Sequence, residues 1–519
     1  MGAAPAPTGL LPDGFLTVAS QLAANVARTP DKPALICVDD GRALSWAELG
    51  GWVARVGHLL RAMGIGANDR VAVLGDNSLE NLILYYGIQA HGATYCTVNV
   101  EVNRHHLQEM LDRIAPKAVF WQEDLADIEL GSPGTWIPYG PHDGTGPGLF
   151  AMLDSMPAGP APETAGGPED GAVISFTSGT SAAPKGVLHS FCNYFAIAQH
   201  QLDRWDMTAG DRVLEFRSFS WASAHMLSLN PVLRAGATLL FARAFSRSRF
   251  AGWLTGMRPS VVIAVPTVVN MLLERKLDGA AEAFKSVRFV SCSTAPLMPD
   301  QHRRFEDTYG VALVQLYGMS EGGVVCANRP GTRRIGSVGE PGMYQQIHIK
   351  GPDGGDLPVG ETGDIVTVSA QHAHAYLHRG DEIEPIRGGE LPTGDIGYID
   401  EDGFVHVTGR ARDVIIRGGV NIAPLEIDAV LAEHPDVAKA AAFGIPDPVF
   451  GEKVAAWVVA RPGTGLTATD IEAHCAARLP DAKRPSPVEI VAALPKNARG
   501  KIDRAALRQA WEKAGEGGD

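Results

Sequence analysis

The residues with the clearest chemical potential lie between Ile174 and Val187, in the stretch ISFTSGTSAAPKGV. An apolar, β-prone run ends there in a loop of Ser, Thr and Gly residues with one lysine, Lys185. Hydroxyls, backbone N–H groups and a mobile cation together suit a polyphosphate. The P-loop pattern G-x-x-x-x-G-K-[ST] does not fit, because Gly186 follows Lys185 and Gly179 lies six residues before it. The sequence therefore predicts a phosphate-binding loop of another kind.

Four further polar stretches follow this loop in the chain. They read QLYGMSE at residues 315–321, LPTGD at 391–395, GRARD at 409–413 and PKNARGK at 495–501. Taken in this order with TSGTSAAPKG, they resemble the motifs of the adenylate-forming superfamily: acyl-CoA synthetases, beetle luciferases and the adenylation domains of peptide synthetases. The resemblance covers nearly the whole chain, from about residue 15 to 508. No single motif is specific, but five in order are.

The resemblance implies an α/β fold. A large N-terminal domain of α/β layers, with a small β-barrel-like part, is expected over 15–409, and a small mobile α+β domain over 413–508. A hinge is expected at 410–412, with tails at 1–14 and 509–519. The implied reaction has two steps. A carboxylate attacks the α-phosphate of ATP to give an acyl-adenylate and pyrophosphate, and a thiol, usually of coenzyme A, then displaces AMP.

The resemblance assigns the β- and γ-phosphates to a set of residues in the first motif: Thr177, Ser178, Gly179, Thr180 and Lys185. Ala182 departs from the family, which usually has glycine there. Because alanine tolerates positive φ less well, we expect a differently shaped or less mobile turn. Read alone, the same stretch is an ordinary surface loop; the other motifs favour the phosphate-binding interpretation.

Glu321 is the implied Mg²⁺ ligand, since a carboxylate oxygen is a hard donor, and Ser320 is expected to contact the α-phosphate. Tyr317 of the Tyr317-Gly318 pair is expected to stack on adenine. The other side of the ring would be lined by the segment Ser293, Thr294, Ala295 and Pro296. The alternatives are a helix N-terminal acid for Glu321 and a core position for Tyr317.

Asp395 is the expected ribose ligand, because one carboxylate accepts hydrogen bonds from both hydroxyls. Arg410 is expected on the phosphate side, and Arg412 is the hinge residue, or else a solvated surface charge. Lys501 is the expected catalytic lysine. A cation there would offset charge on the five-coordinate phosphorus and orient the attacking oxygen.

The loop containing Gly418 and Gly419 resembles the one that lines the pantetheine tunnel of coenzyme A after the small domain rotates. Glycine permits that close approach. Phe450 and the basic pair Lys483-Arg484 are weaker coenzyme A candidates, and each has a structural alternative.

The acyl pocket is expected to be lined by residues from three segments: Ser220, Trp221, His225, Ser291 and Gly322. Peptide-synthetase domains usually have Asp where Ser220 stands, so an amino-acid substrate is disfavoured. Trp221 would shorten the pocket or gate a tunnel, and His225 is either a substrate contact or a satisfied helix residue. Arg217 keeps malonate-like acids open, but we expect a medium-chain, branched or alicyclic monocarboxylate.

The length, net charge and cysteine pattern of the chain limit the class of protein. The chain has 519 residues and a formal charge of −14, which argues against general binding of nucleic acid or anionic membranes. Six scattered cysteines without a C-x-x-C motif indicate reduced thiols. No segment approaches a transmembrane length and the N-terminus lacks a signal-peptide pattern, so a cytoplasmic protein is expected. The resemblance to acyl-CoA synthetases implies fatty acid metabolism as its setting and keeps a homodimer as one option.

Alternating patterns predict the elements that position these residues. Strands are expected near 71–74, 95–99, 118–121, 213–216, 238–242 and 261–265, and helices near 52–63, 77–90, 104–113, 224–233 and 246–256. This rhythm predicts parallel strands with crossover helices. Short strands follow residue 364, and a separate α+β unit follows residue 409.

Three functions remain open. The first is an AMP-forming acid–CoA ligase that uses ATP, Mg²⁺ and coenzyme A. The second is a free-standing adenylation enzyme that loads a carrier protein. The third is an inactive nucleotide-binding regulator, which the presence of Lys185, Glu321, Asp395, Arg410 and Lys501 disfavours. A luciferase-like oxygenase shares the adenylation half and is not separated by motif.

Overall fold

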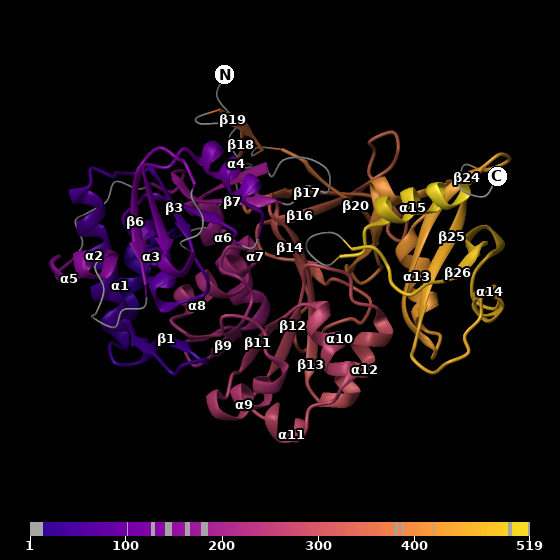
Figure 1. Ribbon diagram of the computed structural model, residues 1–519, viewed down its shortest axis with the longest axis horizontal. Coiled ribbons are helices and arrows are strands. Elements are labelled where there is room, and N and C mark those ends of the chain that lie inside the picture. The colour runs from indigo at the N-terminus through magenta and orange to yellow at the C-terminus, as the bar shows by residue number, and fades with distance from the viewer. Residues whose placement is uncertain are drawn as a thin grey trace.

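The computed structural model describes residues 14–100, 102–125, 130–140, 148–160, 167–177, 185–378, 382–386, 389–418, 420–496 and 501–516. Figure 1 shows two large sheets with their helices on the left and below, a smaller sheet above the centre, and the C-terminal part of the chain on the right. Within the described residues, no helix combines the length and the apolar character needed to cross a bilayer.

One large sheet carries the first motif. Its order is β19-β18-β8-β7-β4-β3-β5-β6, parallel from β7 to β6 and antiparallel from β7 to β19. In chain order its strands are β3 (Arg70–Leu74), β4 (Thr94–Val98), β5 (Ala118–Gln122), β6 (Thr135–Tyr139), β7 (Gly171–Thr177), β8 (Lys185–Ser190), β18 (Ala375–Leu377) and β19 (Ile383–Pro385). The described part thus brings β18, almost two hundred residues downstream, beside the first motif.

The second large sheet has the order β15-β14-β13-β12-β11-β9-β10-β1-β2. Its strands are β1 (Pro33–Cys37), β2 (Ala43–Ser45), β9 (Arg212–Glu215), β10 (Thr238–Phe241), β11 (Val261–Ala264), β12 (Phe289–Cys292), β13 (Ala312–Met319), β14 (Gly323–Ala327) and β15 (Glu340–Pro341). From β1 to β13 the neighbours are parallel. The loops after β9, β12 and β13 therefore meet at one edge of the sheet, as in other parallel α/β sheets.

Helices connect and cover these strands. They are α1 (Val18–Arg28), α2 (Trp46–Ala62), α3 (Leu79–Ala90), α4 (Arg104–Ile114), α5 (Leu149–Asp154), α6 (Phe191–Trp205), α7 (Ala222–Ala224), α8 (Asn230–Ala235), α9 (Arg247–Met257), α10 (Pro266–Glu274), α11 (Ala280–Ala283) and α12 (Pro299–Tyr309), with short turns η1 (Glu123–Leu125) and the π-helical η2 (His225–Leu229). Every residue of α3 is buried. The largest core cluster includes residues of α3 and of both sheets.

A four-stranded antiparallel sheet, ordered β16-β17-β20-β21, follows. Its strands are β16 (Gln345–Lys350), β17 (Gly363–Ser369), β20 (Leu391–Ile399) and β21 (Val405–Arg410). The predicted barrel-like part corresponds to this sheet, which is not closed into a barrel within the described strands. β20 carries Asp395 and β21 ends at Arg410, so the sheet delivers both residues to the site.

The C-terminal unit has its own sheet and cores. The strands are β22 (Ile415–Arg417), β23 (Val420–Ile422), β24 (Val437–Asp447), β25 (Gly451–Ala460) and β26 (Val488–Ile490). The helices are η3 (Ala411–Asp413), α13 (Pro424–Ala432), α14 (Ala468–Ala476), η4 (Asp481–Lys483) and α15 (Arg504–Glu516). Two separate apolar clusters fill it, so a distinct small unit packs independently of the large sheets.

The predicted alternation of strands and helices is confirmed, with one local correction. The helix that begins near Asn77 is capped by the Ser78 side chain, which accepts a hydrogen bond from the Asn81 N–H. Asn77 instead donates to the carbonyls of Arg217 and Ala242 and accepts from the Phe219 N–H. Asn77 thus holds the loop after β9, which carries part of the predicted acyl pocket.

Candidate active site

The phosphate motif lies on a β-hairpin. Thr177 ends β7 and is in register with Lys185, the first residue of the antiparallel strand β8. The next helix, α6, begins only at Phe191, whereas a P-loop runs straight from a strand into a helix. This geometry explains why the sequence fails the P-loop spacing. Ser178, Gly179, Thr180 and Ala182 lie outside the described residues.

Lys185 and Glu321 are joined through a residue that sequence reasoning missed. Tyr376 of β18 lies opposite Val187 of β8, and the Lys185 Nζ stands 5.2 Å from the centre of its ring. The Tyr376 hydroxyl donates to Glu321 Oε1 at 3.3 Å. Burial, and then the charge of Glu321, raise the pKa of the Tyr376 phenol. Tyr376 therefore links the predicted pyrophosphate lysine to the predicted metal ligand.

Glu321 fits the role of a magnesium ligand. Its carboxylate is partly buried and, within the described chain, forms no ion pair. The described residues contain no cluster of three His, Cys, Asp or Glu side chains that could cage a metal. Mg²⁺ usually binds through one or two carboxylates together with substrate phosphates, so one carboxylate beside the predicted phosphate-binding motif would be sufficient.

Ser320, the predicted α-phosphate contact, is held by its backbone. The His189 Nε2 donates to the Ser320 carbonyl at 2.7 Å. His189 is fully buried, and this burial lowers its pKa to about 4. The ring is therefore neutral at physiological pH, and the Ser320 carbonyl fixes Nε2 as the protonated nitrogen. His189 is a second site residue that the sequence did not reveal, because no motif surrounds it.

The strongest polar contact in the site joins Tyr317 to Asp395. The Tyr317 hydroxyl donates to Asp395 Oδ2, and the Arg410 Nε lies 2.8 Å from Oδ1. Asp395 is directly opposite Arg410 in the β20–β21 register. Its backbone N–H donates to Thr393 Oγ1 at 3.1 Å. The structure thus brings together the predicted adenine, ribose and phosphate-side residues.

The Asp395 carboxyl also interacts electrostatically with a charged residue of the C-terminal unit. Burial raises the pKa of this carboxyl, which is only 5% exposed. The charge of Arg410, the Tyr317 hydrogen bond and the charges of Lys501 and Arg412 partly offset that rise. Lys501, from the C-terminal unit, therefore lies within electrostatic reach of a residue in the large domain.

The loop after β12 forms the other wall of the predicted adenine site. Cys292 of β12 is in register with Gln315 of β13, so residues 293–296 and Tyr317 emerge at the same sheet edge. Thr294 has φ +74°, which is unusual for a β-branched residue. Such a conformation costs about 1–3 kcal/mol and persists only where the surroundings hold it. Ala295 is partly buried and Pro296 is exposed.

Three of the predicted acyl-pocket residues, Ser220, Trp221 and His225, lie between β9 and the end of η2. Trp221 and Ser220 are partly buried, and the Thr97 hydroxyl donates to the Ser220 carbonyl at 2.7 Å. His225 is fully buried, with Nε2 at 2.6 Å from the Phe219 carbonyl and Nδ1 at 3.3 Å from the Tyr194 hydroxyl. Burial lowers its pKa to about 4. Of the two roles predicted for His225, these contacts favour the satisfied helix residue.

His225 begins a π-helical turn, an irregularity that often marks functional sites. Its ring lies among three buried tyrosines, Tyr85, Tyr95 and Tyr194. Ser291 is fully buried at the end of β12, and its hydroxyl has no hydrogen-bond partner in the described chain. Gly322 is buried against the Met319 side chain.

Arg217, the residue that keeps malonate-like acids open, is already paired inside the protein. Its guanidinium forms a buried pair with Glu215, with Nη2–Oε2 at 2.5 Å and Nε–Oε1 at 2.9 Å. Arg217 is 4% exposed and Glu215 is 0% exposed. The Ser228 hydroxyl also donates to Glu215. The charge of Arg217 is thus compensated inside the protein.

The predicted coenzyme A residues also lie together. Gly418 has φ +57°, and its N–H donates to the Phe450 carbonyl at 2.8 Å. The Arg417 guanidinium lies 5.1 Å from the centre of the Phe450 ring and donates to the carbonyls of Asp481 and Ala482. The adjacent Lys483 pairs with Glu426, and Arg484 pairs with Asp481. Gly419 lies outside the described residues.

The hinge candidate Arg412 sits in η3, directly after Arg410. Its side chain is 61% exposed, and its Nε lies 3.7 Å from Asp413 Oδ1. This short 3₁₀ turn separates β21 of the small antiparallel sheet from β22 of the C-terminal unit. A connection of three residues between two separately packed units is where a rotation would be absorbed.

Comparison with known proteins agrees with this arrangement. Residues 22–377 match the model of the AMP-binding enzyme family, and residues 426–501 match the AMP-binding enzyme C-terminal domain. The chain belongs to the AMP-binding enzyme family. The predicted class, an adenylate-forming enzyme similar to the acyl-CoA synthetases, is therefore confirmed.

Known relatives and a solved structure match this chain over 90–96% of its length. A sulfoacetate–CoA ligase of Cupriavidus necator is 32% identical, covering 96% of this chain and 98% of its own. A feruloyl-CoA synthase of Amycolatopsis is 30% identical, covering 90% and 94%. The crystal structure of ATP-bound MatB from Rhodopseudomonas palustris superposes with a TM-score of 0.85 at 28% identity, covering 96% and 99%. The acids named by these relatives differ, so the family does not define the substrate.

Proposed function

We propose that this AMP-binding enzyme activates a carboxylic acid as its acyl-adenylate and transfers the acyl group to coenzyme A. The observation that carries the proposal is the convergence on Asp395 of Tyr317, Arg410 and Lys501, the last from the C-terminal unit. Adenylation needs a nucleotide held by the large domain and a cation brought to its α-phosphate, and in this proposal Asp395 and Lys501 would serve these two ends.

In this proposal, the adenine ring of ATP lies between Tyr317 and the segment 293–296, and Asp395 accepts the ribose hydroxyls. Thr177, Ser178, Gly179, Thr180 and Lys185 would hold the β- and γ-phosphates. Ser320 would contact the α-phosphate, with Gly318 allowing the nucleotide to approach. Glu321 would hold Mg²⁺, which when bound supplies positive charge to the phosphate oxygens.

Lys501 would orient the substrate carboxylate and offset the charge that develops on the α-phosphate. A carboxylate oxygen attacks the α-phosphorus, the new O–P bond forms, and the bond to the bridging oxygen of pyrophosphate breaks. The coenzyme A thiolate then attacks the acyl carbonyl, and AMP leaves with the electron pair of the C–O bond. The cluster of Gly418, Phe450 and Arg417 supports a coenzyme A site on the C-terminal unit.

For the acid, we propose a monocarboxylate with an uncharged body, of medium chain length, branched or alicyclic. Supporting this, the predicted lining contains no unpaired cation among its described residues: Arg217 is neutralised by Glu215, and burial lowers the pKa of His225 to about 4. Burying an uncharged acyl group against this lining therefore costs less desolvation free energy than burying a charged one.

A small dianionic acid is the second candidate. The relative that is 32% identical is named a sulfoacetate–CoA ligase, and the buried Arg217 Nη1 has no hydrogen-bond partner in the described chain. Sulfoacetate therefore belongs in the substrate panel beside hexanoate, isovalerate and cyclohexanecarboxylate.

The experiment is to follow pyrophosphate release with ATP–Mg²⁺ and each acid, with and without coenzyme A. The proposal predicts coenzyme A-dependent turnover with a monocarboxylate whose acyl group carries no further charge. Pyrophosphate release that coenzyme A does not accelerate would favour loading of a carrier protein. Absence of pyrophosphate with every acid would contradict the proposed activity and favour a nucleotide-binding regulator.

A further inference from the structure

The segment between β14 and β15, residues 328–339, is called the brace here because it contacts two different sheets. It begins at Asn328, which is 1% exposed. The backbone N–H and the Nδ2 of Asn328 both donate to the Gln315 carbonyl, at 3.1 Å and 3.2 Å. Gln315 lies in β13, two residues before Tyr317. The start of the brace is therefore bonded to the strand that carries the predicted adenine contact.

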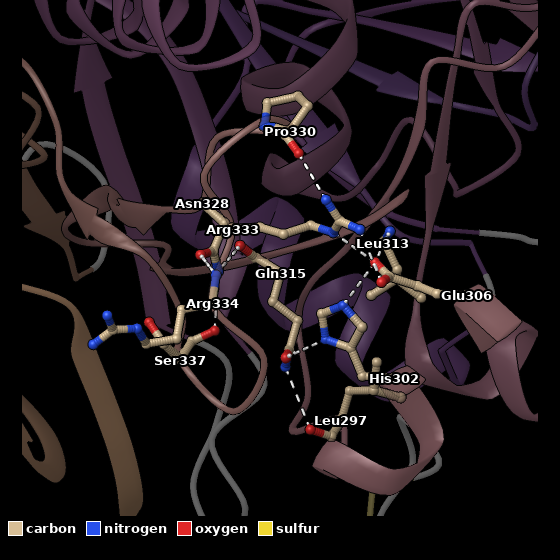
Figure 2. A network of polar contacts seen from close by, with 10 residues as sticks. All are labelled: Leu297, His302, Glu306, Leu313, Gln315, Asn328, Pro330, Arg333, Arg334 and Ser337. Carbon is tan, nitrogen blue, oxygen red and sulfur yellow. Dashed lines mark hydrogen bonds and ion pairs between the residues drawn. The ribbon is translucent and has the colours of Figure 1, made fainter. Parts of the chain in front are cut away.

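The Asn328 side chain also fixes the shape of the brace, as Figure 2 shows. Its Nδ2 donates to the Ser337 carbonyl at 3.0 Å, and its Oδ1 accepts from the Arg334 N–H at 2.9 Å. With carbonyls on Nδ2 and an N–H on Oδ1, these contacts agree on one orientation of the amide. A buried amide whose groups are all matched stabilises the loop around it, whereas an unmatched one is costly.

An ion pair connects the brace to α12. Arg333 Nε and Nη2 lie 2.6 Å and 2.9 Å from the two oxygens of Glu306. Burial raises the pKa of Glu306, but the hydrogen bonds from His302, Arg333 and Leu313 outweigh it and hold the pKa at about 2. Glu306 is therefore ionised at physiological pH. In Figure 2 the side chains of Arg333 and Arg334 point in opposite directions, so the brace extends one cation to each side.

Arg334 connects the brace to the hairpin of β20 and β21. Its Nη1 lies 2.5 Å from Asp400 Oδ2, and its Nη2 lies 2.5 Å from Asp402 Oδ2. The guanidinium also lies 4.4 Å from the centre of the Phe404 ring. All three partners belong to the turn at residues 400–404, which joins the two strands. One side chain of the brace thus binds this turn at three points.

Main-chain contacts continue this attachment. The Val405 carbonyl accepts from the Val338 N–H at 2.9 Å, and the Val405 N–H donates to the Gly339 carbonyl at 2.8 Å. Gly339 has φ +98°, and a Cβ on it would lie 2.1 Å from the Ala327 carbonyl carbon and 2.2 Å from the Asn328 nitrogen. Glycine permits this close approach. The brace therefore packs tightly between the end of β14 and the start of β21.

The same hairpin carries the predicted ribose ligand. Asp395 of β20 lies opposite Arg410 of β21, and its carboxylate accepts from the Tyr317 hydroxyl of β13. This hydrogen bond joins two sheets, so its geometry depends on how the hairpin is placed relative to β13. The brace is bonded to both partners, to β13 through Gln315 and to the hairpin through Arg334.

We propose that the brace is a positioning element for the nucleotide, in which Arg334, held by Asn328, places the β20–β21 hairpin so that the Asp395 carboxylate meets the ribose hydroxyls. This inference rests on the proposed function, which assigns the ribose to Asp395. Arg334 acts through the hairpin and is not itself a ligand of the nucleotide. Its loss weakens recognition of the ribose hydroxyls, because hydrogen bonds weaken steeply with misplacement of the acceptor.

Ribose recognition is measured by calorimetry with Mg²⁺ and without an acid substrate, as the Kd of ATP against the Kd of 2′,3′-dideoxy-ATP, which lacks both hydroxyls. The wild type is expected to prefer ATP by about tenfold or more, as for hydrogen bonds to a charged group. Arg334→Met is expected to reduce this preference about threefold or more by raising the Kd of ATP alone. Arg334→Lys keeps the charge and is expected to retain more of the preference.

Arg55→Met is the matched control. Arg55 pairs with Asp154 at 2.7 Å and lies 4.8 Å from the centre of the Trp52 ring, so it combines an ion pair with an aromatic contact as Arg334 does. It joins α2 to α5 and is expected to keep the wild-type preference. An unchanged preference in Arg334→Met, or an equal rise in the Kd of both nucleotides, overturns the inference.

Hydrogen exchange without nucleotide separates this inference from the proposed function. The backbone amides of β20 are expected to exchange faster in Arg334→Met than in the wild type or Arg55→Met. Unchanged exchange overturns the inference, whatever the nucleotide affinities. A wild type that binds both nucleotides equally refutes the ribose role of Asp395. Faster exchange in Arg334→Met would then show that the proposed function had failed, and not the attachment of the hairpin by the brace.

Discussion

The hydroxyl of Tyr317 offers a quantitative test of the site, because Tyr317→Phe keeps the ring and removes one hydrogen bond to Asp395. Burial already raises the pKa of Asp395, and the Tyr317 hydrogen bond is one of the interactions that oppose the rise. A hydrogen bond to an ionised group contributes about 1.5–3 kcal/mol. Its removal should therefore raise the pKa of Asp395 further.

The sign of the effect on activity follows from the role of the carboxylate. Only the ionised form accepts both ribose hydroxyls, so a higher pKa weakens ATP binding at low pH. We expect the acid limb of kcat/KM for ATP to move to higher pH in Tyr317→Phe. On that limb the KM for ATP should rise about 10- to 100-fold, the loss of one hydrogen bond to a charged group. On the alkaline side, where Asp395 is ionised in both proteins, the two KM values should converge.

The assay is ATP–pyrophosphate exchange across the pH range at saturating acid. Tyr398→Phe is the control, because Tyr398 lies in the same strand as Asp395 but stacks on His406. Equal acid limbs for wild type and Tyr317→Phe would refute the coupling between Tyr317 and Asp395. A KM that rises equally at all pH values would show that the hydroxyl acts without changing the ionisation of Asp395.

Three further predictions concern other parts of the molecule. Glu321→Gln should raise the Mg²⁺ concentration for half-maximal pyrophosphate release about 10-fold or more, since a contact to a charged group is lost; an unchanged Mg²⁺ dependence would exclude Glu321 as a ligand. Arg217→Met leaves the buried Glu215 carboxylate unpaired and should lower the unfolding free energy, measured in urea, by about 3–5 kcal/mol. Adding Glu215→Gln should restore most of this loss, and a double variant as unstable as the single one would contradict the prediction. Burial lowers the pKa of His200 from 6.5 to about 3, so its contribution to stability is present above about pH 6.5 and is lost as pH falls. His200→Asn should therefore reduce the slope of unfolding free energy against pH by up to about 1.4 kcal/mol per pH unit near pH 5. An unchanged slope would contradict this prediction.

The layout of the fold was predictable because its signals are local. The short apolar run Val71 to Leu74 predicted a strand, and the start signal at Asn77 and Glu80 predicted the helix that ends near Ala90; both formed as expected. The pairing of β18 with β8 was not predictable, because a three-residue strand at 375–377 gives no periodic signal and its partner lies far away in sequence. Tyr376 was missed for that reason.

The site residues also fall into two groups: those that a sequence motif identifies and those whose contacts arise only from tertiary packing. Tyr317, Asp395 and Arg410 could be predicted because each stands in a recognisable motif. The β20–β21 register and the Tyr317 hydrogen bond bring them together. The buried His189 stands in no motif, and its contact with Ser320 depends on tertiary packing. The compensation of Arg217 by Glu215, two residues away, requires the irregular backbone after β9 and so did not follow from sequence.

The central claim, that a carboxylate oxygen attacks the α-phosphate of ATP, has a direct test. The preferred acid, labelled with ¹⁸O in its carboxylate, is incubated with ATP–Mg²⁺ and coenzyme A, and the nucleotide product is analysed by mass spectrometry. The account predicts that the product is AMP and that each AMP carries one atom of ¹⁸O from the acid. Label recovered in inorganic phosphate with ADP as the nucleotide product, or AMP free of label, would contradict it.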